Sequence, residues 1–275
     1  MDWNPVHTGR FLSGDVEGGV CLWEPCEGGW DVSEIMRSPV SRGGKKSTSS
    51  SSRNKPQSFS SSSSSLCRFE GVTPGSTVEE TQWKIKGSGA GDVFATASSD
   101  GGIRIYDCRS SSRAPCLALL HAHASDVNAL RWSPVHGDLL LSGDEDGCAK
   151  VWDERFGESP LVVMHWHKKP ITSLDWHPTD EATFATSSLD NSIALWDMSV
   201  EIDQDETPAE QEDPAQKKKN AKGEEDDPKS KLPEQLMFLH LGQDHISELK
   251  FHPLIPGVVI STACDGFNFF KTCNI

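Results

Sequence analysis

The chain has 275 residues and a formal net charge of −15, from 41 acidic and 26 basic side chains. A nucleic-acid binder that ignores sequence needs basic residues to neutralise phosphates, so this charge argues against that class and favours basic partners. Apolar residues make up 35% of the chain, and its nine tryptophans can supply much of a folded core. The length fits one large all-β domain or two smaller domains.

A repeated two-part pattern organises the chain. An aromatic-x-Pro element is followed about 20 residues later by a short apolar segment that ends in an aromatic residue. Alternation in period two, as in Ile103–Tyr106, favours strands over helices. Tyr106, Trp152 and Trp196 follow one another at 46 and 44 residues, the spacing of four-stranded propeller blades. We predict repeats at 1–25, 66–109, 121–155, 165–199 and 235–272, within one domain at 1–275.

Two polar segments interrupt the repeats. Residues 38–65 are rich in serine and carry basic residues, whereas residues 200–233 hold acidic blocks around the lysine run 217–222. Neither segment has enough apolar residues to order itself, so we predict two disordered insertions. Both fit solvated loops; the first also fits a phosphorylated or basic targeting segment, and the lysine run fits a nuclear signal.

The acidic half of the second insertion is a candidate site for a basic client. It contains seven acids and no base. Such a block can shield a strongly basic protein through many weak, salt-sensitive contacts. The candidate residues are Glu201, Asp203, Asp205, Glu206, Glu210, Glu212 and Asp213.

Polar residues recur at fixed places inside the repeats. An acid lies six residues before the closing aromatic residue, a hydroxyl lies four before that acid, and in two repeats a His lies 29 before the Trp. This pattern resembles the WD-repeat family, in which His, Ser or Thr, Asp and Trp form a hydrogen-bonded network in each blade. The resemblance implies two such networks: His123, Ser142, Asp146 and Trp152, and His167, Thr186, Asp190 and Trp196. The other repeats lack this His, so we expect incomplete networks there.

Five further segments, read in order, resemble the glutamate-rich WD-repeat proteins: 2–5, 11–15, 100–109, 122–128 and 252–267. The resemblance implies an all-β WD-repeat β-propeller of seven blades, of which five are visible here, so we expect an incomplete or open propeller with unpaired edges. It also implies a nuclear and nucleolar assembly factor for the large ribosomal subunit, present in the cytoplasm as well. Such a factor is a chaperone of a basic ribosomal protein, and histone binding is also associated with the family.

The sequence contains no pattern that is typical of a catalytic, metal-binding or phosphate-binding site. The pairs His121/His123 and His165/His167 occupy equivalent places in consecutive repeats, which indicates structural histidines rather than metal ligands. The eight cysteines include no C-x-x-C pair, so we interpret them as free thiols. No nucleophile or phosphate-loop motif occurs. We therefore expect no catalytic residue, cofactor or metal, and no direct sequence-specific nucleic acid or membrane partner.

Two alternative functions remain open. Asp107 with Arg109, and Asp153 with Arg155, resemble the W-D-x-R motif by which some propellers dock on the adaptor of a cullin-type ubiquitin ligase. On that interpretation the arginines are exposed adaptor-binding anchors; on the plainer one they cap strand ends and pair with nearby carboxylates. The second alternative is a histone-binding chromatin factor, because the acidic segment suits histones as well.

Overall fold

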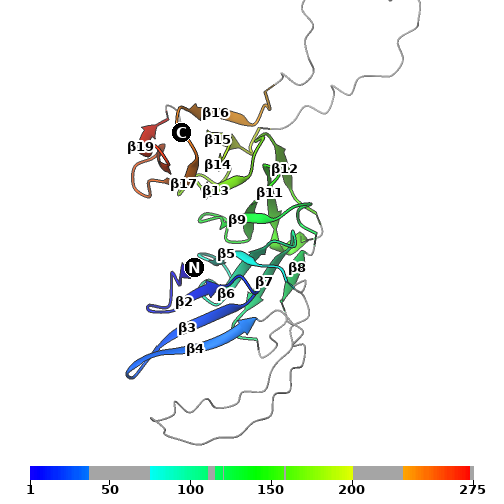
Figure 1. Cartoon of the computed structure of the whole chain (residues 1–275), viewed down its shortest axis with the longest axis vertical. Helices are drawn as coiled ribbons and strands as arrows, with labels where there is room; N and C mark the ends of the chain where they lie inside the picture. The colour runs from blue at the N-terminus through cyan, green and yellow to red at the C-terminus, as the bar shows by residue number, and fades with distance from the viewer. Residues whose placement is uncertain (37–74, 111–114, 120, 158, 201–231, 273–275) are drawn as a thin grey trace, which may run out of the picture. The chain divides into compact units, whose positions relative to one another are not determined.

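The computed structural model describes residues 1–36, 75–110, 115–119, 121–157, 159–200 and 232–272. These residues form five antiparallel sheets, which confirms the predicted all-β fold of propeller blades (Figure 1). The chain divides into two compact units, Met1–Ile171 and Thr172–Ile275. No helix in the described ranges is long and apolar enough to cross a membrane.

The first unit holds three four-stranded sheets, named blades 1, 2 and 3. In each, the strands follow in chain order from one edge to the other. Blade 1 contains β1 (Asp2–Trp3), β2 (Phe11–Gly14), β3 (Val20–Cys26) and β4 (Gly29–Met36). Blade 2 contains β5 (Val78–Trp83), β6 (Val93–Ser98), β7 (Ile103–Asp107) and β8 (Leu117–Leu119). Blade 3 contains β9 (Val127–Trp132), β10 (Leu139–Asp144), β11 (Cys148–Asp153) and β12 (Val162–His165), with the 3-10 turn η1 (Glu154–Phe156) after β11.

The second unit holds blades 4 and 5. Blade 4 contains β13 (Ile171–Trp176), β14 (Thr183–Ser188), β15 (Ser192–Asp197) and β16 (Leu236–Leu241). Blade 5 contains β17 (Ile246–Phe251), β18 (Val258–Ala263) and β19 (Gly266–Lys271), and it has three strands within the described residues. Although the fifth repeat was predicted to begin at residue 235, β16 pairs with β15 and so completes blade 4. The parts of the predicted insertions at 38–65 and 201–231 lie outside the described residues.

Alternation along the strands gives each blade two different apolar faces. In blade 2, Trp83, Phe94 and Tyr106 form an aromatic face, with ring centroids 5.6 and 5.1 Å apart. Ala95 and Ile105, which pair across β6 and β7, lie on the opposite, aliphatic face. Because successive side chains in a strand point to opposite faces, the spacing of these residues alone determines which face each one joins.

The aliphatic face of one blade packs on the aromatic face of the next. Three buried clusters show this arrangement: blade 1 on blade 2, blade 2 on blade 3, and blade 4 on blade 5. In the first cluster Leu12, Val20 and Leu22 cover the aromatic face of blade 2. Burying each large apolar side chain stabilises the fold by about 1.5 to 3 kcal/mol. The buried apolar residues at these junctions therefore contribute strongly to the stability of the fold.

Side-chain acceptors also connect the first strands of neighbouring blades. Asp2 accepts from the Trp83 amide at 2.7 Å, Gln82 accepts from the Trp132 amide at 2.5 Å, and Asp175 accepts from the Phe251 amide at 2.8 Å. Each acceptor stands one residue before the aromatic residue of its own first strand. The amides of a first strand that face the neighbouring sheet have no backbone acceptor, and these side chains supply one. The bonds therefore fix the position of one blade's first strand along that of the next.

Candidate functional site

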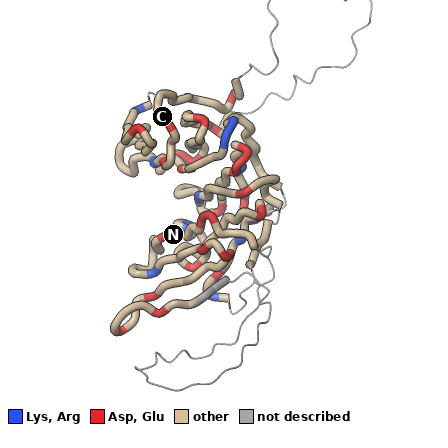
Figure 2. The backbone as a smooth tube through the Cα atoms, in the orientation of Figure 1, with Lys and Arg blue, Asp and Glu red and all other residues tan. Residues whose placement is uncertain are grey.

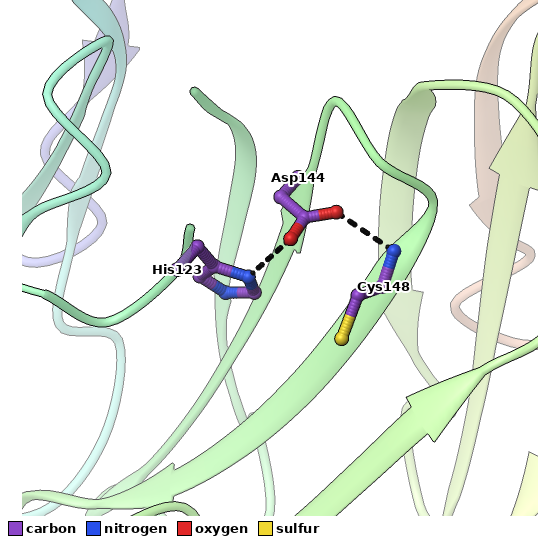
Figure 3. Close-up of side chains that lie close together, drawn as sticks. All are labelled: His123, Asp144 and Cys148. Atoms are coloured by element: carbon purple, nitrogen blue, oxygen red, sulfur yellow. Dashed lines mark hydrogen bonds and ion pairs between the residues drawn. The ribbon is translucent and has the colours of Figure 1, made fainter. Parts of the chain in front are cut away.

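The polar network of blade 3 links the segment before β9 to the hairpin of β10 and β11. His123 Nδ1 lies 2.8 Å from an Asp144 carboxylate oxygen, as Figure 3 shows. His123 Nε2 lies 2.7 Å from Ser142 Oγ, and Trp152 Nε1 donates to the same hydroxyl at 2.8 Å. Three of the four predicted network residues therefore meet: His123, Ser142 and Trp152.

The carboxylate in this network is Asp144, so the prediction of Asp146 was wrong. Asp144 ends β10, where the pairing with β9 shifts register after Gly143. Its side chain is buried, and it also accepts from the Cys148 amide at 2.7 Å. Asp146 is exposed in the turn that follows. Counting six residues back from Trp152 leads to Asp146 in the turn. Because the register shifts after Gly143, the side chain that contacts His123 is instead that of Asp144, two residues earlier.

Burial and hydrogen bonding set the protonation of this network. Burial lowers the pKa of His123 below its ordinary value, although the Asp144 carboxylate acts in the opposite direction. For Asp144, burial acts to raise the pKa, but the hydrogen bonds from His123 and the Cys148 amide outweigh it, and the pKa is lowered. The imidazole is therefore neutral at pH 7, with its proton on Nδ1, and Nε2 accepts from the Ser142 hydroxyl.

His123, Asp144 and Cys148 also bring three possible metal ligands within 4.8 Å of one another (Figure 3). Both imidazole nitrogens already have hydrogen-bond partners. Burial raises the pKa of the Cys148 thiol to about 11, which favours the protonated thiol over the thiolate that metals bind. This donor set fits a hydrogen-bonded core of the blade better than a metal site.

Blade 4 contains part of the second predicted network. Trp196 Nε1 donates to Thr186 Oγ1 at 3.0 Å. His167 is buried in the first unit, and its role in this network stays a prediction. Asp190 lies in the turn after β14, where it accepts from the Ser192 amide at 3.1 Å and from the Ser192 hydroxyl at 2.5 Å. The position equivalent to Asp144 is Ser188.

Blade 5 uses a different residue in place of the missing His. Ser261, the hydroxyl equivalent to Ser142, donates to Oε1 of Gln243, and both side chains are buried. Gln243 precedes its serine by 18 residues, whereas His123 precedes Ser142 by 19. Gln243 thus takes the place of the His, while the closing aromatic residue of this blade is Phe270, which has no N–H to donate to Ser261.

Blade 2 has a network built on a buried arginine. Arg104 is 1% exposed; it donates to Ser98 Oγ at 2.6 Å and to Asp100 Oδ2 at 2.7 Å. Asp100 occupies the turn position of Asp146, and Arg104 occupies the strand position of Lys150. The sequence pattern drew attention to Asp100, but the alternation of apolar residues around Arg104 gave no reason to expect a charge inside the blade.

The two predicted W-D-x-R sites have the same geometry. Arg109 Nε and Nη2 donate to the Asp107 carboxylate at 2.9 and 2.7 Å. Arg155 Nε and Nη2 donate to Asp153 at 2.9 and 2.6 Å. These hydrogen bonds lower the pKa of both carboxyl groups. The arginine side chains are 57% and 62% exposed, so each arginine closes a turn while part of its guanidinium faces solvent.

A buried lysine, which the sequence analysis missed, lies beside one of these sites. Lys84 is 1% exposed and donates to Asp138 at 3.1 Å. It also forms an ion pair with Glu154, which is the x residue of the W-D-x-R sequence that ends at Arg155. Its Nζ lies 5.3 Å from the ring centroid of Trp132. Glu154 is thus committed to the junction of blades 2 and 3, whereas Arg155 remains at the surface. This contact depends on the packing of blade 2 against blade 3, which the sequence pattern does not reveal.

Acidic residues stand in the turn between the second and third strands of every blade. Figure 2 shows the acidic positions along the backbone in red. The turn residues are Glu17, Asp100, Asp146, Asp190 and Asp265. All candidate client-binding acids between Glu201 and Asp213 lie outside the described residues.

Comparison with known proteins agrees with this architecture. A family model described as "WD domain, G-beta repeat" matches residues 114–153 and 158–197. A chain in a crystal structure of the Mitotic Checkpoint Complex is similar in fold, with a TM-score of 0.62 at 14% identity. That match covers 98% of this chain and 60% of the other, and it bears on the fold alone.

Curated relatives match along nearly the whole chain. Protein HEAT STRESS TOLERANT DWD 1 of Arabidopsis thaliana is 34% identical over 100% of this chain and 49% of its own length. Ribosome assembly protein rrb1 of Schizosaccharomyces pombe is 34% identical over 99% of this chain and 47% of its own length. The chain thus spans about half the length of these two relatives.

A shorter match supports the narrower resemblance found in the sequence. Glutamate-rich WD repeat-containing protein 1 of Dictyostelium discoideum is 57% identical over 42 residues, which cover 15% of this chain and 9% of that protein. Together with the repeats and the five sheets, these matches show that the chain belongs to the WD-repeat family and, within it, is similar to ribosome assembly protein rrb1.

Proposed function

We propose that this chain is a non-catalytic protein-binding scaffold that acts as a chaperone of a basic ribosomal protein during assembly of the large ribosomal subunit. The observation that carries the proposal is the similarity to ribosome assembly protein rrb1, which extends over 99% of the chain. The proposed location is the nucleus, mainly the nucleolus, with a cytoplasmic pool.

The charge of the chain supports a basic client. The net charge is −15, and each blade carries an acid in the turn between its second and third strands. An acidic surface attracts a basic protein at long range and covers charges that would otherwise bind RNA prematurely. The polar clusters of blades 2, 3 and 5 are buried and internally bonded, which suits a structural role better than catalysis.

Affinity purification of the tagged protein from its own cells, at moderate and at high salt, tests the proposal. We expect one basic large-subunit ribosomal protein together with precursor-ribosome factors, and loss of the ribosomal protein as salt rises. Recovery of histones without ribosomal factors would instead support the histone-binding alternative. Recovery of folding chaperones alone would contradict both.

Docking on a cullin-ligase adaptor is the second candidate function. The observation that favours it is the matching pair of partly exposed arginines, Arg109 and Arg155. The plainer interpretation, in which both arginines cap their turns, is supported by the hydrogen bonds to Asp107 and Asp153.

Two variants separate these functions. Arg109→Ala with Arg155→Ala should abolish adaptor binding if the second candidate is right, and should leave client binding intact. Deletion of residues 201–213 should weaken client binding and leave adaptor binding intact. Both variants are compared with the unmodified chain in the same purification. If neither variant changes the recovered partners, these two sets of residues are not the binding determinants.

A further inference from the structure

A cavity lies between blades 2 and 3, within the first unit. Its volume is about 490 Å³, and ligand sites generally measure about 300 to 1,000 Å³. One wall is β8, the outer strand of blade 2, and all three of its residues line the cavity. The other wall is blade 3, through Trp152 of β11 and through Gly157 and Pro160, which precede the outer strand β12 (Figure 1). The cavity therefore follows the outer edges of two consecutive blades.

Apolar side chains extend this cavity along β12. Val163 pairs with Lys150 across β11 and β12, and Leu161 stands two residues before Val163, so both side chains share the face of Lys150, which lines the cavity. Val163 is 42% exposed and Leu161 is 55% exposed. On the other wall, Leu117 and Leu119 are partly buried against the core between the two blades. The cavity and these four leucine and valine side chains are named the rim groove.

Lys150 places a positive charge in the rim groove. It donates to the Ala122 carbonyl oxygen at 2.6 Å, and its Nζ lies 5.8 Å from the ring centroid of Trp152. Among the described residues, Lys150 takes part in no ion pair, and no Asp or Glu of the described ranges lines the cavity. Arg104, at the equivalent strand position of blade 2, is instead neutralised by Asp100 at 2.7 Å.

We propose that the rim groove binds an extended acidic segment of a partner protein, with an apolar side chain in the cavity and a neighbouring carboxylate on Lys150. Charge complementarity selects this occupant. The chain carries a net charge of −15, yet the described lining of the cavity offers a lysine and no acid. An ammonium group has three donors, and the bond to Ala122 uses one of them. A carboxylate can accept from the others.

The edge strands favour an extended segment over a compact ligand. β8 and β12 stand at the ends of their sheets, so each has one side without a strand partner in the described ranges. Such an edge can add an extended peptide as a further strand, while pockets beside it select alternate side chains. A segment that pairs with β8 would therefore present every second side chain to the cavity.

This site differs in charge from the site proposed for the client. The client is basic and meets acidic residues of the chain, whereas the segment in the rim groove is acidic and meets Lys150. The two partners therefore do not compete for the same residues, and one chain can hold both at once. The inference does not depend on the identity of the client.

Selection of a displayed random-peptide library on the purified 275-residue chain tests the proposal. We expect the enriched peptides to combine a leucine or an aromatic residue with a nearby Asp or Glu. Lys150→Met removes the ammonium group but keeps a long side chain over Trp152, and it should weaken binding of the selected peptide by about tenfold. Leu161→Ser should weaken it as well, through lost apolar contact. The control Lys86→Met makes the first change at an exposed lysine outside the cavity and should leave the affinity unchanged.

Amide versions of the peptide supply the decisive measurement. Replacing its acids by Asn or Gln should weaken binding to the unmodified chain and change little in Lys150→Met, because the charge pair is already lost there. Equal weakening in both proteins would overturn the contact with Lys150. Circular dichroism of each variant checks that the strands are intact.

Three other outcomes would overturn the proposal. The first is enrichment of no peptide, or of basic peptides alone, which would bind the acidic residues instead. The second is an acidic peptide that binds Lys150→Met and Leu161→Ser unchanged, because it uses another surface. The third is full displacement of the peptide by an equal concentration of octanoate, which would assign the groove to a small carboxylate. Deletion of residues 201–213 should weaken client binding and leave peptide binding in place, so failure of one proposal is distinguishable from failure of the other.

Discussion

Asp144 and Asp146 stand two residues apart in the same hairpin, yet only one of them lies inside the blade. Asp144 accepts from His123 and from the Cys148 amide, so Asp144→Ala leaves two buried donors without their acceptor. We expect this change to lower the free energy of unfolding by about 2 to 3 kcal/mol. Asp146→Ala, at an exposed turn position, should change it by less than about 0.5 kcal/mol. Urea unfolding followed by tryptophan fluorescence measures both; equal effects would contradict the assignment of Asp144.

The His123 imidazole makes the stability of blade 3 depend on pH. Its pKa is lower in the folded chain than in the unfolded chain, mainly because of burial. As pH falls below about 6.5, the unfolded chain takes up a proton that the folded chain resists, so stability falls. Below about 3.8 the lowered pKa of Asp144 adds a loss of the same sign.

His123→Gln isolates the histidine contribution, and Gln243 shows that glutamine can bond a serine at this position. Since glutamine does not titrate, the loss of stability between pH 7.5 and 5.5 should be smaller in the variant than in the unmodified chain. Urea midpoints at the two pH values give the comparison. Parallel losses in the two proteins would show that His123 does not control this response.

At the scale of strands, much of the fold could be predicted from the sequence. Alternation and the aromatic-x-Pro elements predicted strands, because the side chains of a strand point alternately to the two faces of its blade, one aromatic and one aliphatic. The partners of Asp144, Arg104 and Lys84 could not be predicted in this way. The partners of Asp144 depend on a register shift at Gly143, and those of Lys84 depend on the contact between blades 2 and 3. Arg104 is bonded within its own hairpin, to Ser98 and Asp100. None of these contacts leaves a periodic signal in a single chain.

The contacts between first strands lead to a prediction for the junction of blades 4 and 5. Asp175 accepts from the Phe251 amide at 2.8 Å, so Asp175→Ala should leave this amide without its acceptor and cost about 1 to 2 kcal/mol of unfolding free energy. Asp175→Asn keeps an oxygen at the same place and should cost less than half as much. Both variants change the same half-buried position, so a thermal unfolding series compares them directly. Equal losses would show that the charge of Asp175, which lies 3.6 Å from Lys250 Nζ, matters rather than the acceptor.

At the scale of the whole molecule, the junctions within each unit, between blades 1 and 2, 2 and 3, and 4 and 5, each join two chemically distinct faces. Stability in such repeat proteins is approximately a sum over blades and junctions. The exposed Trp3 and Phe269 are consequences of the same alternation that buries Trp83 and Leu22.

The charge of the whole molecule gives the last prediction, which concerns binding of a basic client. Deleting residues 201–213 removes seven acids and no base, which changes the net charge from −15 to −8. Deleting 47–59 removes the same number of residues but takes away Arg53 and Lys55, which changes it from −15 to −17. With a defined poly-lysine peptide as the probe, the first deletion should weaken binding by about tenfold at low salt and flatten its salt dependence. The second, matched deletion should bind at least as tightly as the unmodified chain, because it has lost only positive charge. Titration at several salt concentrations measures both, and equal weakening by the two deletions would show that segment length, rather than acidic charge, governs client binding.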